Sequence, residues 1–384
     1  MAVKAIQKML AASVMLLAAN VASAAFVLVG PQKSVAGDPA VTETHWEAEV
    51  PPGGKYDRIG LHRYAPAKRR PVAVMFYLPG TNMNGELAVT DPDHNLWLYL
   101  AARGVTVYTL DYRTHFVPNE PVPDLDFMKG WTVGRFVDDG GLALSEIARQ
   151  APQLPLFVAG FSRGAGYAYI LAGSRPVAGL IALDGGFKRY REQAFNRKAA
   201  LRMLAASDRY GSVLAQRRGW SGRMEMMRRA AENPDGPAMG KFPSIGAQVE
   251  SLLYYQWGPG ALANPVDGIS SVKVLARAIM HYDRTFPTIQ DVEARAMADQ
   301  ANDPATLLDD HFGYMEVPVL YFGSTGMGAD NLMSGIYSAS HSGSKDVTIN
   351  VLEKYGHLDV LYGDQARRDV YAVVDAWIRH HLPH

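Results

Sequence analysis

The residues with the clearest chemical potential stand at 160–164, which read Gly-Phe-Ser-Arg-Gly around Ser162. An apolar, strand-like run (154–159) precedes this segment, and a helix-compatible stretch of small residues (165–168) follows it. A Gly-x-Ser-x-Gly turn between a strand and a helix is sharp and exposes the serine hydroxyl above the sheet. The pattern therefore predicts that Ser162 is a nucleophile. An ordinary Gly/Ser turn would explain the loop but not the symmetric glycines.

A serine hydroxyl near neutral pH needs a general base within reach and an acid that orients the base. His357 is the predicted base, because it lies just after the last expected strand and before the last expected helix. For the acid we favour Asp330, which follows the strand at 317–323 through a glycine-containing loop. Asp184, at the end of the preceding strand, is the rival. Asp359, two residues after His357, is interpreted as a helper in the histidine loop.

The negative charge that develops on the substrate needs two preorganised backbone N–H donors. We expect one from Arg163, directly after the serine, and one from Thr81, in the loop after the strand at 72–78. Asn82 is the alternative to Thr81, and Gly80 lets this loop approach the substrate closely. This chemistry requires no metal and no cofactor, and the sequence contains no His-Glu-x-x-His or comparable metal-ligand spacing.

The chain resembles the α/β-hydrolases. The matching segments are the serine motif at 160–164, Leu-Pro-Gly at 78–80, Leu-Asp-Tyr-Arg at 110–113 and Gly-His-Leu-Asp-Val at 356–360. The resemblance covers about 55–186 and 317–381, with departures at Pro79 and at Thr114-His115, where many members have His and Gly-His. It implies a lipase-like or esterase-like serine hydrolase with a Ser-His-Asp triad. The segment 187–316 matches no motif of the family, so the resemblance does not supply a substrate.

The elements that must position these residues can be read from periodicity. Buried strands are expected at 72–78, 105–112, 154–161, 177–183, 317–322 and 347–352, a hairpin at 41–65, and helices at 93–103, 133–150 and 365–381. Strands that alternate with helices predict an α/β fold, with a mostly parallel sheet covered by helices on both faces. Between 187 and 316 no buried strand is expected. This segment is therefore predicted to be a helical cap inserted between two parts of the core, 25–186 and 317–384.

The N-terminal segment and the composition limit the class of protein. Residues 1–24 have the form of a signal peptide, with Lys4 and Lys8 before an apolar stretch and Ala22-Ser23-Ala24 as the cleavage site. We therefore expect export to a bacterial periplasm or beyond.

The chain has 38 Lys and Arg, 38 Asp and Glu, and no Cys. The zero net charge argues against a nucleic-acid partner, and disulfides and thiol catalysis are excluded. No later segment approaches the length of a membrane span.

The expected cap is segregated by charge. Residues 187–241 have 13 Lys and Arg against 5 Asp and Glu, a difference of +8, whereas residues 242–312 have 4 against 9, a difference of −5. Two solvated helical faces that attract each other explain this pattern. The alternative is a basic rim that attracts an anionic substrate.

The sequence as a whole predicts an exported serine hydrolase that cleaves small-molecule or lipid-like carboxylic esters through an acyl-enzyme intermediate. The alternative is amide or peptide hydrolysis by the same triad, as in an exported serine aminopeptidase. A non-catalytic binding protein with the same fold is the third hypothesis. An intact serine, acid and histidine in the right order count against it.

Overall fold

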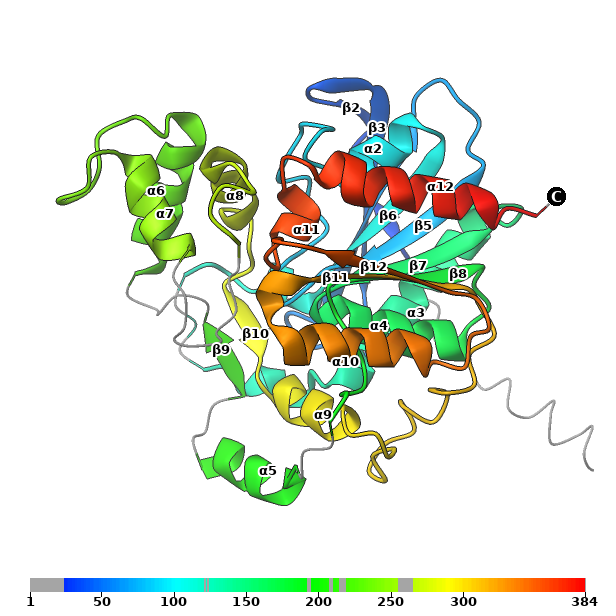
Figure 1. Ribbon diagram of the computed structural model, residues 1–384. Helices are drawn as coiled ribbons and strands as arrows, with labels where there is room; N and C mark the ends of the chain where they lie inside the picture. The colour runs from blue at the N-terminus through cyan, green and yellow to red at the C-terminus, as the bar shows by residue number, and fades with distance from the viewer. Residues whose placement is uncertain are drawn as a thin grey trace, which may run out of the picture.

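A ten-stranded sheet forms the centre of the molecule (Figure 1). The computed structural model describes residues 24–120, 122, 124–191, 195–206, 210–213, 219–254 and 265–383. Of the predicted signal peptide, all but Ala24 lies outside the described residues. The strands run in the order β1-β3-β4-β6-β5-β7-β8-β11-β12, and β2 pairs with β3. The pairs from β6 to β12 are parallel, whereas those among β1, β2, β3, β4 and β6 are antiparallel.

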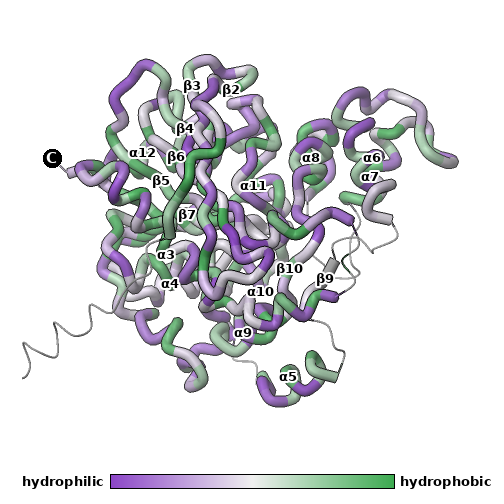
Figure 2. Tube along the Cα trace, turned by 180° about the vertical axis from the view of Figure 1, so that it is seen from behind, coloured by the Kyte–Doolittle hydropathy of each residue, from purple (hydrophilic) through white to green (hydrophobic). Residues whose placement is uncertain are grey.

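The strand bounds agree closely with the expected runs. They are β1 Val27–Leu28, β2 Lys33–Val35, β3 Asp38–Glu49, β4 Arg58–Pro66, β5 Ala73–Leu78, β6 Val105–Asp111, β7 Leu156–Phe161, β8 Gly179–Leu183, β11 Val319–Ser324 and β12 Val347–Leu352. Every residue of β5, β6 and β8 is buried. Hydrophobic stretches, drawn green in Figure 2, gather along the central strands. Strands buried on both faces are typical of a parallel sheet between two helical layers.

Helices cover both faces of this sheet (Figure 1). One layer contains α3 (Val133–Gln150), α4 (Arg163–Ser174) and α10 (Ala329–Ser340), and the other contains α2 (Leu96–Ala102) and α12 (Ala372–His380). Alternate residues of β5 point into the two cores: Phe76 packs in the core that contains α3 and α4, and Met75 packs in the one that contains α2 and α12. The predicted fold class is therefore confirmed.

Helix α3 shows why its two internal glycines do not break it. A Cβ atom at Gly140 would lie 3.0 Å from Leu171 Cδ1 of α4. The glycine thus allows α3 and α4 to pack closely, and this packing offsets the low helix propensity of glycine. At the C-terminus, a π-helical turn over Arg367–Tyr371 precedes α12 within the single helix expected at 365–381.

The segment between β8 and β11 is mostly helical. Its elements are α5 Arg197–Ala206, β9 Gly211–Val213, α6 Trp220–Glu232, α7 Ile245–Leu253, α8 Val272–Ile279, β10 Thr285–Pro287 and α9 Ile289–Met297. The antiparallel pair of β9 and β10 corrects the expectation that this segment contains no strand. Three-residue strands are too short to show alternation, so sequence periodicity does not detect them. Within the described residues, no helix has both the length and the apolar character that a membrane span requires.

Candidate active site

Ser162 stands at the sharp turn between β7 and α4, with φ 55° and ψ −120°. The flanking glycines are required by close backbone contacts. A Cβ atom at Gly160 would lie 2.2 Å from the carbonyl oxygen of Gly164, and one at Gly164 would lie 2.1 Å from the carbonyl oxygen of Leu78. A positive φ at a non-glycine residue is strained and persists only when its surroundings hold it. The turn therefore has the geometry of a nucleophile elbow.

His357 lies beside this turn and is held by an acid. Its Nδ1 atom is 2.7 Å from Asp184 Oδ2, and its ring stacks on that of Phe161 with centroids 4.5 Å apart. Asp184 is buried and follows the last residue of β8. Ser324 also donates to this carboxylate, from its backbone N–H to Oδ1 and from its hydroxyl to Oδ2, both at 2.7 Å. The two donors of Ser324 therefore fix the carboxylate so that its Oδ2 faces the imidazole.

The structure corrects the choice of acid. Asp330, the acid that the sequence favours, lies in the first turn of α10, and its side chain is 78% exposed and 3.9 Å from Arg191. Helix α10 begins at Ala329, directly after Gly328, so the chain carries Asp330 to the helix surface. The rival Asp184 occupies the position beside His357. The strand order explains this outcome, since β8 is the direct neighbour of β7, whose end carries the serine.

Asp359 supports the histidine loop, as expected from the sequence. It is fully buried, and its carboxylate accepts hydrogen bonds from the N–H of Gly356 at 2.8 Å and from the hydroxyl of Ser270 at 2.5 Å. Ser270 belongs to the segment between β8 and β11. The loop that carries His357 is therefore fastened to that segment.

Thr81 and Arg163 both face the space above Ser162. The two residues line the same cavity as Ser162 and His357. The loop of Thr81 approaches the serine closely, because a Cβ atom at Gly80 would lie 3.1 Å from Ser162 Cβ. Arg163 is the first residue of α4, where backbone N–H groups have no partner within the helix. Asn82 does not line this cavity; it is buried, and its side-chain amide donates to the carbonyl of Asp283 at 2.9 Å.

The cavity has a volume of about 470 Å³ and is lined partly by residues of α4, α9 and α10. Helix α9 belongs to the segment between β8 and β11. The Arg163 side chain ties this helix to the elbow, because its guanidinium pairs with Asp291 and donates to the carbonyl of Gln290 at 3.3 Å. Two further arginines, Arg189 and Arg295, line the cavity. Its wall is therefore of mixed polarity rather than a continuous apolar tunnel.

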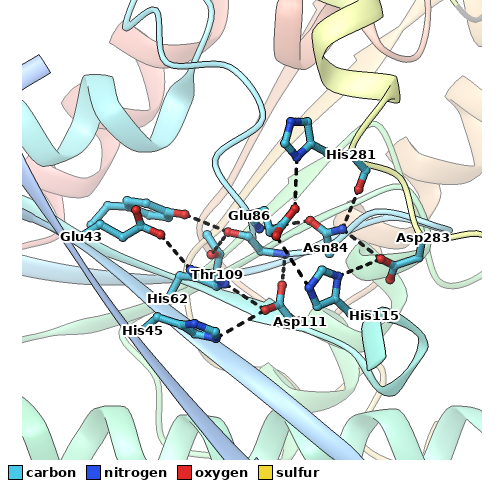
Figure 3. Close-up of polar contacts among 12 residues, drawn as sticks. Glu43, His45, His62, Asn84, Glu86, Thr109, Asp111, His115, His281 and Asp283 are labelled. Carbon is cyan, nitrogen blue, oxygen red and sulfur yellow. Dashed lines mark hydrogen bonds and ion pairs between the residues drawn. The ribbon is translucent and has the colours of Figure 1, made fainter. Parts of the chain in front are cut away.

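One described group of side chains is close enough to share a metal ion: His45, His62 and Asp111, on neighbouring strands (Figure 3). The rings of His45 and His62 stack in parallel, with centroids 4.1 Å apart and planes 5° apart, so their nitrogen lone pairs do not converge on one point. His62 instead bridges Glu43 at 3.0 Å and Asp111 at 2.9 Å. Burial disfavours the charged ring, but the two carboxylates outweigh it and raise the pKa of His62 to about 9. A protonated His62 fits this cluster better than a metal ion does.

The chain is similar in structure to solved α/β proteins. No protein-family model matches the chain, and no curated protein matches it. A Sulfolobus solfataricus protein provisionally assigned as a lipase is 25% identical, with a TM-score of 0.72, over 93% of this chain and 99% of that one. A thermostable carboxyl esterase from Bacillus coagulans, solved with glycerol, is 14% identical, with a TM-score of 0.50, over 94% and 99%. The first of these likenesses supports the fold class described above.

Proposed function

We propose that this member of the α/β-hydrolase superfamily is a serine hydrolase that cleaves carboxylic esters. One observation carries the proposal: the strained Ser162 lines the same cavity as His357, and Asp184 holds the Nδ1 atom of that histidine. The names of the two structural neighbours, a provisional lipase and a carboxyl esterase, support ester hydrolysis as the general reaction.

In the proposed mechanism, the Ser162 hydroxyl attacks the ester carbonyl while His357 Nε2 accepts its proton. Asp184 keeps Nδ1 protonated and stabilises the imidazolium that forms. The backbone N–H groups of Arg163 and Thr81 donate to the oxyanion. The proton on Nε2 then passes to the departing alcohol, which leaves an acyl-enzyme on Ser162. Water, activated by His357, releases the acid and restores the hydroxyl.

The cavity favours a small ester as substrate. Its volume of about 470 Å³ lies within the usual range for small-ligand sites, and two arginines contribute to its wall. Arg189 lies in the segment after Asp184, and Arg295 lies in the last turn of α9. These two guanidinium groups suit an ester that carries a carboxylate elsewhere in the molecule.

The test is a substrate panel with the purified mature chain. The panel contains neutral short and long acyl esters, half-esters of dicarboxylic acids, and aminoacyl amides. The proposal predicts turnover of short esters that Ser162→Ala abolishes. Turnover of the aminoacyl amides with no turnover of any ester would instead support the peptidase alternative. Long acyl esters preferred over short ones would contradict a small substrate.

We also propose that the chain is exported, on the composition of residues 1–24. Mass spectrometry of the chain from a bacterial host fractionated into cytoplasm and periplasm tests this proposal. The expected product is periplasmic and begins at Ala25. Full-length chain confined to the cytoplasm would contradict it.

A further inference from the structure

The loop that presents Thr81 contains a strained residue. The N–H of Met83 donates to the carbonyl of Gly80 at 3.1 Å, so Thr81 and Asn82 are the central residues of a tight turn. Asn82 has φ 62°. Asparagine reaches this left-handed region more readily than most residues, but such a conformation still needs support from its surroundings. The position of Thr81 therefore depends on what holds Asn82.

Asn82 is held by a residue 201 positions further along the chain. The backbone N–H of Asp283 donates to the carbonyl of Asn82 at 2.7 Å, and the Asn82 amide donates to the carbonyl of Asp283 at 2.9 Å. Asp283 belongs to the segment between α8 and β10. This reciprocal pair ties the turn of Thr81 directly to the insertion.

The Asp283 carboxylate fixes that pair in place (Figure 3). Its side chain is only 4% exposed and accepts hydrogen bonds from the Asn84 amide at 2.9 Å and from the Thr114 hydroxyl at 2.9 Å. His115 Nδ1 lies 3.0 Å from the same carboxylate. Burial disfavours a charged His115, but the hydrogen bond to Asp283 and the nearby carboxylates outweigh it and raise its pKa to about 10. Asp283 therefore faces a charged donor and two neutral donors.

The far end of the same loop is anchored in the sheet. The N–H of Gly85 donates to Asp111 Oδ1 at 2.7 Å, and its carbonyl accepts from the hydroxyls of Tyr64 at 3.0 Å and Thr109 at 2.7 Å. The loop after β5 is thus fixed by the sheet at Gly85 and by the insertion at Asn82. Asp283 supplies the second of these anchors but does not line the cavity.

We propose that Asp283 is a positioning residue for catalysis, which holds the Asn82 turn so that the Thr81 N–H meets the oxyanion. This inference rests on the proposed serine hydrolase mechanism. An oxyanion donor is effective only at about 2.7–3.1 Å from the developing charge. A small displacement of Thr81 therefore weakens transition-state binding more than substrate binding.

Two variants test the inference with the full chain. Asp283→Asn keeps the shape of the side chain but removes its negative charge beside His115. Asn82→Gly tolerates the positive φ but removes the amide that donates to Asp283. The matched control is Asp303→Asn, which changes another buried aspartate of the insertion, paired with Arg197 and outside the cavity lining.

The readouts are kcat per active serine, KM, and the inhibition constant of a trifluoromethyl ketone. Active serines are counted by titration with a fluorophosphonate. Such a ketone forms a tetrahedral adduct with the serine and places its oxyanion where that of the transition state lies. Loss of one donor typically costs about 10²–10³-fold in kcat, so a displaced donor is expected to cost about tenfold. We expect both test variants to lose about tenfold in kcat, with KM changed less than threefold and the inhibition constant raised about tenfold. Asp303→Asn should match the wild type.

The inference is overturned if kcat per titrated serine stays within twofold of the wild type in both variants. It is also overturned if only the number of active serines falls, since Asp283 would then stabilise the fold without positioning Thr81. A wild-type chain that neither reacts with the fluorophosphonate nor turns over an ester overturns the proposed function, and this inference with it.

Discussion

The assignment of Asp184 as the acid makes a sharp prediction for Asp184→Asn. Ser324 donates its backbone N–H to Oδ1, and this donor cannot turn away. The oxygen of the new amide must therefore take the Oδ1 position, which places its NH2 group toward His357 Nδ1. Since an NH2 group only donates, His357 would have to accept at Nδ1 and carry its proton on Nε2. A histidine with a protonated Nε2 cannot take the proton of Ser162.

The expected magnitude follows from the role that is lost. In a Ser-His-Asp triad, a wrong histidine tautomer lowers kcat by about 10⁴-fold, which corresponds to roughly 5 kcal/mol of transition-state stabilisation. The assay is kcat for a short activated ester at pH 7.5, per correctly folded chain. Near- and far-ultraviolet circular dichroism establishes that the variant is folded.

The control is Asp330→Asn, because Asp330 is 78% exposed and lies 3.9 Å from Arg191. This variant should keep kcat within twofold of the wild type. If folded Asp184→Asn retained more than a tenth of the wild-type kcat, or if Asp330→Asn lost as much activity as Asp184→Asn, the assignment of the acid would be refuted.

Two further predictions concern stability. Gly164→Ala should lower the free energy of unfolding by about 1–3 kcal/mol or more, because its Cβ would lie 2.1 Å from the Leu78 carbonyl oxygen. Gly222→Ala, whose Cβ would have nothing within 4 Å, should be neutral or stabilising. Urea unfolding compares the two variants, and equal effects would count against a tight elbow. The pKa of His62 in the folded chain is about 9, above its ordinary 6.5. The contribution of His62 to the free energy of unfolding is therefore fully present below pH 6.5 and is lost as the pH rises through 9. Between pH 6 and pH 10, the free energy of unfolding measured with urea should fall by roughly 3 kcal/mol more in the wild type than in His62→Gln. An identical fall in the two chains would contradict a charged His62.

The features that the sequence predicts correctly are those encoded locally. The elbow is visible because its glycines and its flanking runs lie within fifteen residues of Ser162. The placement of His357 near Ser162 could be predicted, because a loop between the last strand and the last helix lies at the edge of the sheet that carries the elbow. The hairpin expected at 41–65 is the antiparallel pair of β3 and β4.

The features that the sequence does not predict depend on distant contacts. Asp184 and Asp330 both follow strands, and only the strand order and the start of α10 decide between them. The contact of Asn82 with Asp283 joins residues 201 positions apart, and no local pattern marks it. Thr114 and His115, which depart from the family pattern, both contact Asp283, and this contact is also distant in the sequence.

The most direct test of the central claim is covalent labelling of the native chain with a fluorophosphonate, followed by mass spectrometry of its peptides. The proposed mechanism predicts one label per chain, on Ser162. Denaturation should abolish the labelling, and Ser162→Ala should abolish both the labelling and the ester turnover. A native chain that stays unlabelled, a label on another residue, or a Ser162→Ala chain that still hydrolyses esters would contradict it.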